Sequence, residues 1–225
     1  MGNETEKRMA AERSLEYVRD GQVVGLGTGS TAAYFIEMLG ARVKQGLKVR
    51  GIPTSDRSRE LAMSLGIPLT DFEEVQQIDV TVDGADEFDP QLRLIKGGGG
   101  ALLREKVVAS ASRQVVVVTD SSKQVPVLGK FPLPVEVVPF AQALVARRIG
   151  DLGAKVARRM KSAGSAYITD SGNQILDCHF GCISDASALA RTLSEMPGIV
   201  EHGLFIGLAS IVLMAGGGKV VEIRR

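Results

Sequence analysis

The feature that most constrains the fold is an alternation of short β-branched runs with amphipathic stretches, which continues to about Asp120. Runs of valine and isoleucine bounded by polar residues are typical of buried strands, and the amphipathic stretches between them are typical of helices. Strands that alternate with helices form a mostly parallel sheet that is covered on both faces. We therefore predict a Rossmann-like α/β domain, with strands at 23–26, 49–52, 78–82 and 115–119 and helices at 9–19, 30–40, 58–65 and 101–112.

The pattern changes after a cluster of prolines between Pro126 and Pro139. The order of elements that follows is typical of a smaller ferredoxin-like α+β domain with one extra strand. Residues 170–173 have the composition of a hairpin turn, and segments 211–214 and 220–223 are predicted to form a final hairpin. The predicted elements of the smaller domain are strand 135–138, helix 142–151, strands 155–160, 166–169 and 174–179, helix 185–195 and strand 199–204.

Composition and charge argue against several classes of function. Apolar residues make up 44% and charged residues 24% of the chain, as in ordinary globular proteins, and a net charge of +1 without a basic run argues against nucleic-acid binding. The apolar segment 204–215 is broken by Gly207 and Ser210 and is too short to span a bilayer, and the N-terminus lacks the apolar stretch of a signal peptide. We expect no membrane partner and a cytoplasmic protein, or a stromal one if the chain is a processed plastid protein.

The two cysteines lie close together, because Cys178 and Cys182 stand on either side of His179. Two thiols and one imidazole on a single short segment, without a second pair of ligands, are too few for a convincing metal site. We therefore expect two reduced thiols and no bound metal.

The first chemical motif is V-G-L-G-T-G-S-T-A-A, residues 24–33. Gly27, Gly29 and Ala32 match a dinucleotide fingerprint, but the acidic residue expected at the end of the second strand is missing. The hydroxyls of Thr28, Ser30 and Thr31 at a helix N-terminus suit a small phosphate better, because a phosphate needs many donors in a small space. The alternative is that Ser30 or Thr31 only caps the helix.

The second motif, D-G-A-D-E-F-D, directly follows the strand that ends at Val82. Ligands of open parallel sheets bind outside the carboxyl ends of the strands, so Asp83 and Asp86 are predicted to face a substrate. Two alternatives are a calcium loop, whose glycine and distal glutamate are missing, and a simple turn at Asp83-Gly84.

The third motif is I-K-G-G-G-G-A-L-L-R-E-K, residues 95–106. Glycines at 97–100 carry a large entropic cost, which is offset if their N–H groups approach a ligand together with Lys96. On the predicted helix, the residues three and four positions from Glu105 on either side are all apolar. We predict a shielded carboxylate at Glu105 with a raised pKa, suited to proton transfer, and the alternative is a solvated surface glutamate.

Lys123 follows the valine-rich strand, again at a carboxyl end. The four motifs are therefore predicted to meet at one rim of the sheet. Neither histidine lies in this half of the chain, so a Ser-His-Asp triad is not supported.

Together, G-L-G-T-G-S-T, D-G-A-D-E, K-G-G-G-G-A-L-L-R-E-K and S-K-Q-V with L-G-K-F-P-L-P-V-E-V resemble the ribose-5-phosphate isomerase A family over nearly the whole chain. The resemblance implies interconversion of ribose 5-phosphate and ribulose 5-phosphate, a step of the pentose phosphate pathway, without metal, nucleotide or other cofactor. It implies a catalytic domain of residues 1–129 plus 204–225 and a smaller domain of residues 130–203 that serves subunit contact in a homodimer or homotetramer. Gly100 departs from the family, which often has alanine there, and a role for Lys7 in phosphate binding stays open.

The resemblance also implies roles for the candidate residues. Glu105 acts as the base that forms an enediolate, Lys96 and the N–H groups of the glycine loop stabilise the oxyanion, and Asp83 and Asp86 hold hydroxyls and assist ring opening. The remaining substrate-binding candidates are Thr28, Gly29, Ser30, Thr31, Gly84, Ala85, Gly97, Gly98, Gly99 and Lys123. Two alternatives are a non-catalytic sugar-phosphate sensor on the same fold and a nicotinamide-dependent oxidoreductase.

Overall fold

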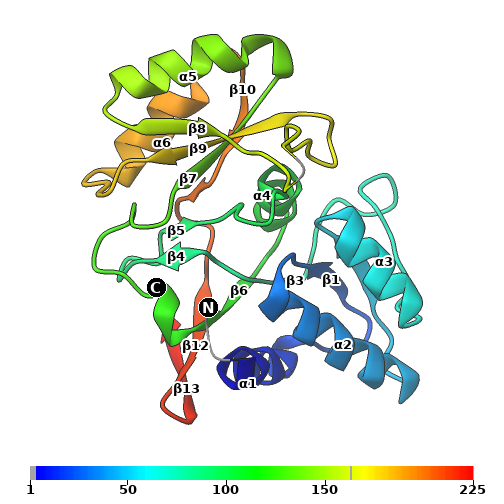
Figure 1. Ribbon diagram of the computed structural model, residues 1–225. Helices are drawn as coiled ribbons and strands as arrows, with labels where there is room; N and C mark the ends of the chain where they lie inside the picture. The colour runs from blue at the N-terminus through cyan, green and yellow to red at the C-terminus, as the bar shows by residue number, and fades with distance from the viewer. Residues whose placement is uncertain (1–3, 163, 225) are drawn as a thin grey trace. The chain divides into compact units, whose positions relative to one another are not determined.

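The structure, a computed structural model, describes residues 4–162 and 164–224. The chain divides into two compact units, which are treated separately (Figure 1). The first unit comprises Met1–Ala85, Arg104–Lys123 and Gly207–Arg225, and the second comprises Asp86–Leu103 and Gln124–Ile206. The predicted domains differ from these units chiefly in residues 86–103, which the prediction assigns to the catalytic domain and which belong here to the second unit. The predicted domain boundaries stay a prediction.

The first unit is built on a six-stranded sheet in the order β13-β12-β6-β3-β1-β2. All neighbouring strands in this sheet are parallel except β13, which pairs antiparallel with β12 as a terminal hairpin. The predicted parallel sheet and the predicted final hairpin are therefore confirmed. The strands are β1 (Val23–Leu26), β2 (Arg50–Pro53), β3 (Val80–Asp83), β6 (Val115–Asp120), β12 (Ile211–Gly216) and β13 (Lys219–Arg224).

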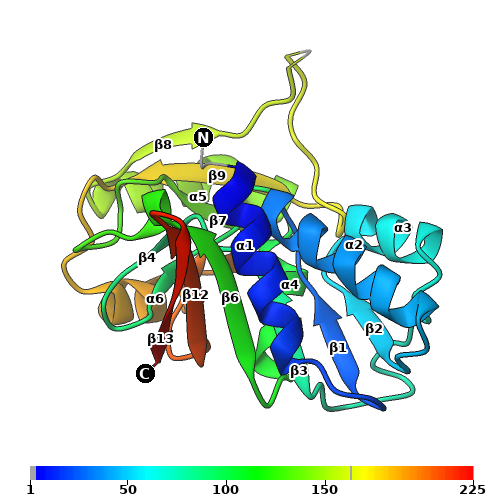
Figure 2. The ribbon, with the colours of Figure 1, turned by 90° about the horizontal axis from the view of Figure 1, so that it is seen from below.

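Helices cover both faces of this sheet. Val24 and Leu26 point toward α2 and its Phe35, whereas Val23 and Ile52 point to the other face and pack with Val108 of α4. Figure 2 shows α1 and α2 side by side on one face. The helices are α1 (Glu4–Ser14), followed by the short η1 (Leu15–Tyr17), then α2 (Ser30–Lys44), α3 (Asp56–Ser64) and α4 (Leu102–Ser110).

The prediction of the first helix at 9–19 was wrong in its bounds. The helix begins at Glu4 and ends at Ser14, where the chain tightens into η1. Its early turns are polar and largely exposed, and only Ala10, Ala11 and Ser14 are buried. Apolar periodicity marks the buried part of a helix, so it does not reveal a solvent-facing first turn.

The second unit contains a four-stranded antiparallel sheet in the order β10-β7-β9-β8, with two helices. This is the order of a ferredoxin-like β-α-β-β-α-β module, so the fold class predicted for the smaller domain is confirmed. Leu133, Val135 and Val137 alternate onto the face that α5 and α6 cover. The elements are β7 (Leu133–Val137), η3 (Pro139–Ala141), α5 (Gln142–Asp151), β8 (Lys155–Arg158), β9 (Gln174–His179), α6 (Ala186–Ser194) and β10 (Ile199–His202).

The predicted extra strand at 166–169 was wrong. Ala166 and Ile168 each make an isolated bridge, to Met160 and Gln174, instead of a continuous ladder. Ile168 is 44% exposed, so its side chain lacks the packing that normally stabilises a β-branched residue in a sheet. The segment is part of a long excursion between β8 and β9, drawn in yellow in Figure 2.

A small three-stranded sheet in the second unit was not predicted, because its strands have only two residues each. It consists of β4 (Glu87–Phe88), β5 (Leu94–Ile95) and β11 (Leu204–Phe205), in the order β11-β5-β4. The predicted strand 199–204 is divided accordingly, since β10 ends at His202 and the chain then joins β5. This sheet fixes the backbone directly before Lys96, whose N–H donates to the Gly203 carbonyl at 2.9 Å.

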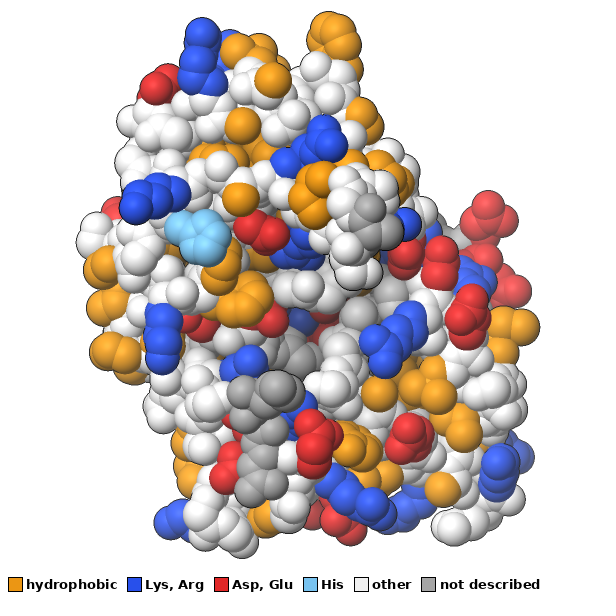
Figure 3. Space-filling model, in the orientation of Figure 1, with side chains coloured by type: hydrophobic (Ala, Val, Ile, Leu, Met, Phe, Trp, Pro, Cys, Tyr) orange, Lys and Arg blue, Asp and Glu red, His pale blue; other side chains and the backbone are white. Residues whose placement is uncertain are grey.

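The surface carries charges of both signs. On the face drawn in Figure 3, lysine and arginine side chains are interspersed with aspartate and glutamate instead of forming one large patch. Among the helices of residues 4–162 and 164–224, none is both long enough and apolar enough to cross a membrane.

Candidate active site

In the first unit, Asp83 organises the loop that follows β1. Its Oδ1 accepts the N–H of Thr28 at 3.0 Å and the N–H of Gly84 at 2.7 Å, and the residue is 3% exposed. A Cβ at Gly27 would lie 2.3 Å from that oxygen and 2.5 Å from the Asp83 Cα, so only glycine fits there. Gly27, which matched the dinucleotide fingerprint, thus serves the close approach of Asp83.

The hydroxyl of Thr28 is enclosed by other hydroxyls. Its Oγ1 lies 2.7 Å from Thr54 Oγ1 and donates to Ser55 Oγ at 2.8 Å. Ser58 Oγ extends this network to the Gly27 carbonyl at 2.6 Å. Sequence reasoning missed these three hydroxyls, although T-S-D-R-S at the end of the second strand was a visible signal. Thr28 therefore braces the loop with both its N–H and its side chain.

The N-terminus of α2 lies at the end of this first glycine loop, Gly27-Thr28-Gly29. The N-cap is Gly29 at φ +106°, and it provides no side-chain cap. The alternative that Ser30 or Thr31 caps the helix was wrong, because the helix begins at Ser30 itself. The first N–H groups of a helix have no partner within the helix, and here they lie beside the hydroxyls of Ser30, which is exposed, and Thr31, which is half-buried. Such an end is suited to an anion.

Glu105 lies in the first turn of α4 and is 4% exposed. The four apolar neighbours predicted around it are all buried: Ala101, Leu102, Val108 and Ala109. The alternative of a solvated glutamate was therefore wrong. Burial disfavours the charged carboxylate, whereas the positive end of the helix dipole favours it.

Lys123 ends the short η2 (Ser121–Lys123) directly after β6, and its side chain is half-buried. Lys7, whose role stayed open, forms an ion pair with Glu4 at 2.6 Å. Both lysines belong to the first unit.

In the second unit, Asp86 and the second glycine loop, Gly97–Gly100, are joined directly. Asp86 Oδ2 accepts the N–H of Gly98 at 2.7 Å. A Cβ at Gly98 would lie 2.6 Å from Asp86 Oδ1, so the glycine permits this approach. The two aspartates of D-G-A-D each bind an N–H of a glycine loop, Asp83 at the first loop and Asp86 at the second.

Lys96 is 4% exposed, and its Nζ lies 5.5 Å from the centre of the Phe205 ring. The negative face of an aromatic ring attracts an ammonium group, which offsets part of the cost of removing the cation from water. Sequence reasoning proposed Lys96 but missed Phe205. It also missed Arg159 and Tyr167, which donate hydrogen bonds to carbonyls of the second glycine loop.

Among residues 4–162 and 164–224, no group of three or more His, Cys, Asp or Glu side chains could hold an ion. Cys178 and Cys182 are free thiols. Burial, with a smaller contribution from Asp177, raises the pKa of Cys178 to about 12, so that thiol is a poor nucleophile and ligand.

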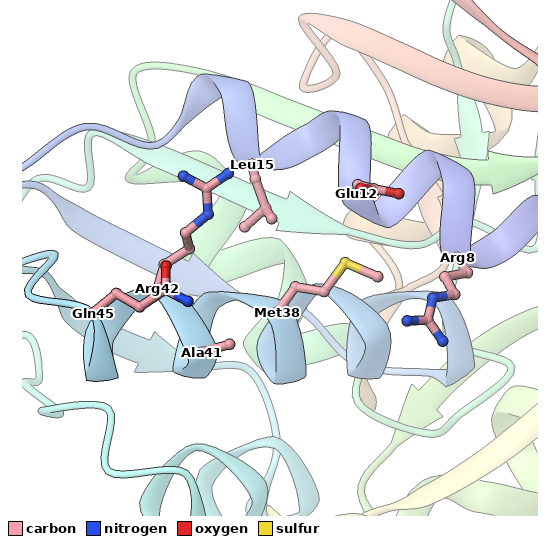
Figure 4. Close-up of a pocket in the computed structure, with 7 residues that line it drawn as sticks. All are labelled: Arg8, Glu12, Leu15, Met38, Ala41, Arg42 and Gln45. Atoms are coloured by element: carbon pink, nitrogen blue, oxygen red, sulfur yellow. The ribbon is translucent and has the colours of Figure 1, made fainter.

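A separate pocket of about 240 Å³ lies between α1, η1 and α2. Figure 4 shows Arg8 and Arg42 toward its two ends, with Leu15 and Met38 between them. None of the predicted site residues lines this pocket. The chemistry predicted from the sequence motifs therefore belongs elsewhere.

Comparison with known proteins identifies relatives of the whole chain. Residues 50–219 match the family Ribose 5-phosphate isomerase A (phosphoriboisomerase A). The chain is 51% identical to ribose-5-phosphate isomerase A of Bradyrhizobium diazoefficiens, over 97% of this chain and 95% of the relative. It is 54% identical to the same enzyme of Nitrobacter hamburgensis, over 97% of each chain.

Solved structures agree. Ribose 5-phosphate isomerase A from Methanocaldococcus jannaschii is 42% identical and superposes with a TM-score of 0.95, over 99% of this chain and 100% of that one. A D-ribose-5-phosphate isomerase in complex with phospho-erythronic acid is 39% identical, with a TM-score of 0.97 over 100% of both chains.

Proposed function

The chain belongs to the ribose 5-phosphate isomerase A family, and on that premise we propose how its own residues carry out the reaction. The protein is an enzyme, an aldose–ketose isomerase that interconverts D-ribose 5-phosphate and D-ribulose 5-phosphate. The alternative of a non-catalytic sensor finds no support among these relatives. The observation that carries the assignment of roles is the buried carboxylate of Glu105, in the helix that directly follows Lys96 and the second glycine loop.

The reaction moves a proton between C2 and C1 of the open-chain sugar. A base near both carbons removes the C2 proton of the aldose, and an enediolate with its charge on O1 forms. A proton then passes from the O2 hydroxyl to O1, and the same base returns its proton to C1, which leaves the C2 carbonyl of the ketose. We assign this base to Glu105. A carboxylate shielded from water is a stronger base than an exposed one, because burial raises its affinity for a proton.

The negative charge that develops on the sugar oxygen needs donors. Lys96 is the cationic candidate, and the N–H groups of the second glycine loop are the neutral ones. Asp83 and Asp86 are assigned to the sugar hydroxyls and to ring opening, in which one proton leaves the C1 hydroxyl and another reaches the ring oxygen. Each of these carboxylates also accepts a backbone N–H, which fixes its orientation.

The phosphate needs an anchor away from the reacting carbons. The exposed N-terminus of α2, with Ser30 and Thr31, is our candidate, joined by Lys123. Binding energy from the phosphate can hold C1 and C2 of the sugar beside the base. Thr28 supports the anchor indirectly through its contacts with Thr54, Ser55 and Asp83.

We also propose a homodimer or homotetramer in the cytoplasm, with the smaller domain in subunit contact. Phe140 and Leu144 expose apolar side chains on that domain, which favours such a contact. Light scattering that reports a stable monomer at working concentration would contradict this part of the proposal.

The direct test is an isomerase assay of the purified protein with ribose 5-phosphate, with and without EDTA. We expect full turnover in both conditions, since carboxylates and a lysine supply the chemistry. Activity that is lost after thorough chelation and restored by one divalent ion would contradict the metal-free mechanism. A thermal shift on adding NAD would instead favour a nicotinamide enzyme.

A further inference from the structure

Side chains hold three consecutive carbonyls of the second glycine loop. Arg159 Nη1 donates to the Gly97 carbonyl at 2.9 Å and to the Gly98 carbonyl at 3.2 Å. The Tyr167 hydroxyl donates to the Gly99 carbonyl at 3.3 Å. Both side chains come from the segment between β8 and β9, about sixty or more residues further along the chain, and all of these residues lie in the second unit.

Asp177 fixes the orientation of the Arg159 guanidinium. Arg159 Nε donates to one carboxylate oxygen at 3.0 Å and Nη2 donates to the other at 2.5 Å. The two side chains are only 14% and 22% exposed. A bidentate pair of this kind restricts the plane of the guanidinium, so the remaining Nη1 group is aimed at the loop.

The carbonyl contacts also determine where the N–H groups point. In a trans peptide the N–H points away from the preceding C=O, and no peptide bond of the described chain is cis. The Gly98 N–H donates to Asp86 at 2.7 Å, and the Gly100 N–H donates to the Gly97 carbonyl at 2.9 Å. Within residues 4–162 and 164–224, no acceptor receives the Gly99 N–H. This N–H points away from the guanidinium that binds the Gly98 carbonyl.

Tyr167 can reach the loop only because residue 100 is glycine. A Cβ at Gly100 would lie 2.2 Å from the Tyr167 hydroxyl oxygen, and φ at Gly100 is +86°. The Tyr167 ring also lies 5.8 Å from Arg159 Cζ, so the two donors pack against each other. The family often has alanine at position 100. In this chain Gly100 leaves the space that the Tyr167 hydroxyl needs to contact the second glycine loop.

We propose that Arg159, oriented by Asp177, is a positioning residue that turns the Gly99 N–H toward the developing oxyanion of the substrate. The proposal rests on the isomerase function above and assigns the neutral oxyanion donor to one peptide group. Binding of a cation to the Gly98 carbonyl also polarises that peptide, which makes its N–H a stronger donor. Arg159 itself touches no reacting atom.

The test compares Arg159→Lys with the matched control Arg158→Lys. Arg158 is the exposed last residue of the edge strand β8, and Arg159 directly follows it. A lysine at 159 keeps the charge but cannot bind both Asp177 oxygens and the two carbonyls at once. We expect kcat for ribose 5-phosphate to fall about 10- to 100-fold in Arg159→Lys, as for a displaced catalytic group, with KM changed less than about twofold. Arg158→Lys should behave as wild type.

A second readout separates positioning from general support of the fold. Phospho-erythronic acid carries a carboxylate that can stand in for the oxyanion. Its affinity should fall in Arg159→Lys by about the same factor as kcat/KM, whereas inorganic phosphate should bind unchanged. If Arg159→Lys folds poorly, Asp177→Asn provides the same comparison with the arginine intact, and kcat should again fall while KM holds.

Unchanged kcat in folded Arg159→Lys and Asp177→Asn would overturn the positioning role alone. A rise in KM with kcat intact would overturn it as well, because that pattern indicates lost ground-state binding. A wild-type protein that fails to isomerise ribose 5-phosphate would overturn both this inference and the proposed function.

Discussion

The two glycine loops of the molecule are held in opposite ways. In the first loop, residues 27–29, a carboxylate from the neighbouring strand binds a backbone N–H, and hydroxyls fill the space beneath. In the second loop, residues 97–100, a guanidinium and a phenol from a distant segment bind the carbonyls. The first arrangement leaves the N-terminus of α2 exposed. The second arrangement leaves one backbone N–H, that of Gly99, without an acceptor among residues 4–162 and 164–224.

This difference corresponds to a division of labour. A helix N-terminus is suited to a stable dianion such as phosphate, which is bound equally before and during the reaction. A single fixed N–H beside a lysine is suited to charge that appears only in the transition state. Variants of the first loop should therefore change KM or folding, and variants around the second loop should change kcat.

The largest effect is expected from Glu105→Gln, in the helix that follows the second loop. Glutamine keeps the shape but cannot accept a proton, so kcat should fall by a factor on the order of 10² to 10⁴, while KM changes little. Steady-state kinetics beside a melting curve measure both. A folded variant that keeps more than about half of wild-type kcat would rule out Glu105 as the base.

The next effect concerns folding and compares one glycine from each loop. A methyl group at Gly27 would meet the Asp83 backbone, which cannot move aside, whereas at Gly98 it would meet only the end of the Asp86 side chain. We expect Gly27→Ala to lower the free energy of unfolding by on the order of 3 kcal/mol and Gly98→Ala by about 1 kcal/mol or less. Urea denaturation measures both, and equal losses would contradict the contrast.

A smaller effect is expected for Ser30→Ala at the anchor. Loss of one hydrogen bond to a charged group should raise KM for ribose 5-phosphate by about tenfold, with kcat unchanged. Ser64→Ala, in the exposed end of α3, is the matched control. If Ser30→Ala lowered kcat instead, the first loop would share in the chemistry and the division of labour would fail.

The smallest effect is expected at the cysteines. With a pKa of about 12, only on the order of one Cys178 in 10⁴ is a thiolate at pH 8. A maleimide reagent should modify the exposed Cys182 and spare Cys178, with activity retained. Rapid labelling of both thiols would contradict this prediction.

The same pKa shift predicts a pH dependence of stability. Because the folded pKa of Cys178 lies above the ordinary value of 9.0, the buried thiol favours folding below pH 9 and loses that contribution as the pH rises toward 12.

The same contrast explains what the sequence could predict. The first loop joins a strand to the helix that directly follows it, so T-G-S-T at the end of a strand identified it. Burial of Glu105 followed from its apolar neighbours at helical spacing. Arg159 and Tyr167 carried no comparable signal, because their partners are backbone carbonyls far away in the chain. Asp177 carried none either, because its partner is the Arg159 side chain. The two-residue strands of the small sheet, one of which directly precedes Lys96, could not be predicted either, since no periodicity can develop over two positions.

The central claim is that the reaction proceeds by proton transfer through an enediolate, with Glu105 as the base. Incubating the enzyme with ribose 5-phosphate in D₂O for many turnovers, and following the sugars by NMR, tests it directly. A base that exchanges its proton with solvent predicts deuterium at C1 of ribulose 5-phosphate and at C2 of ribose 5-phosphate, and Glu105→Gln should lose incorporation and turnover together. Full isomerisation without any deuterium in the products would contradict the account, because it would indicate a hydride shift between the carbons.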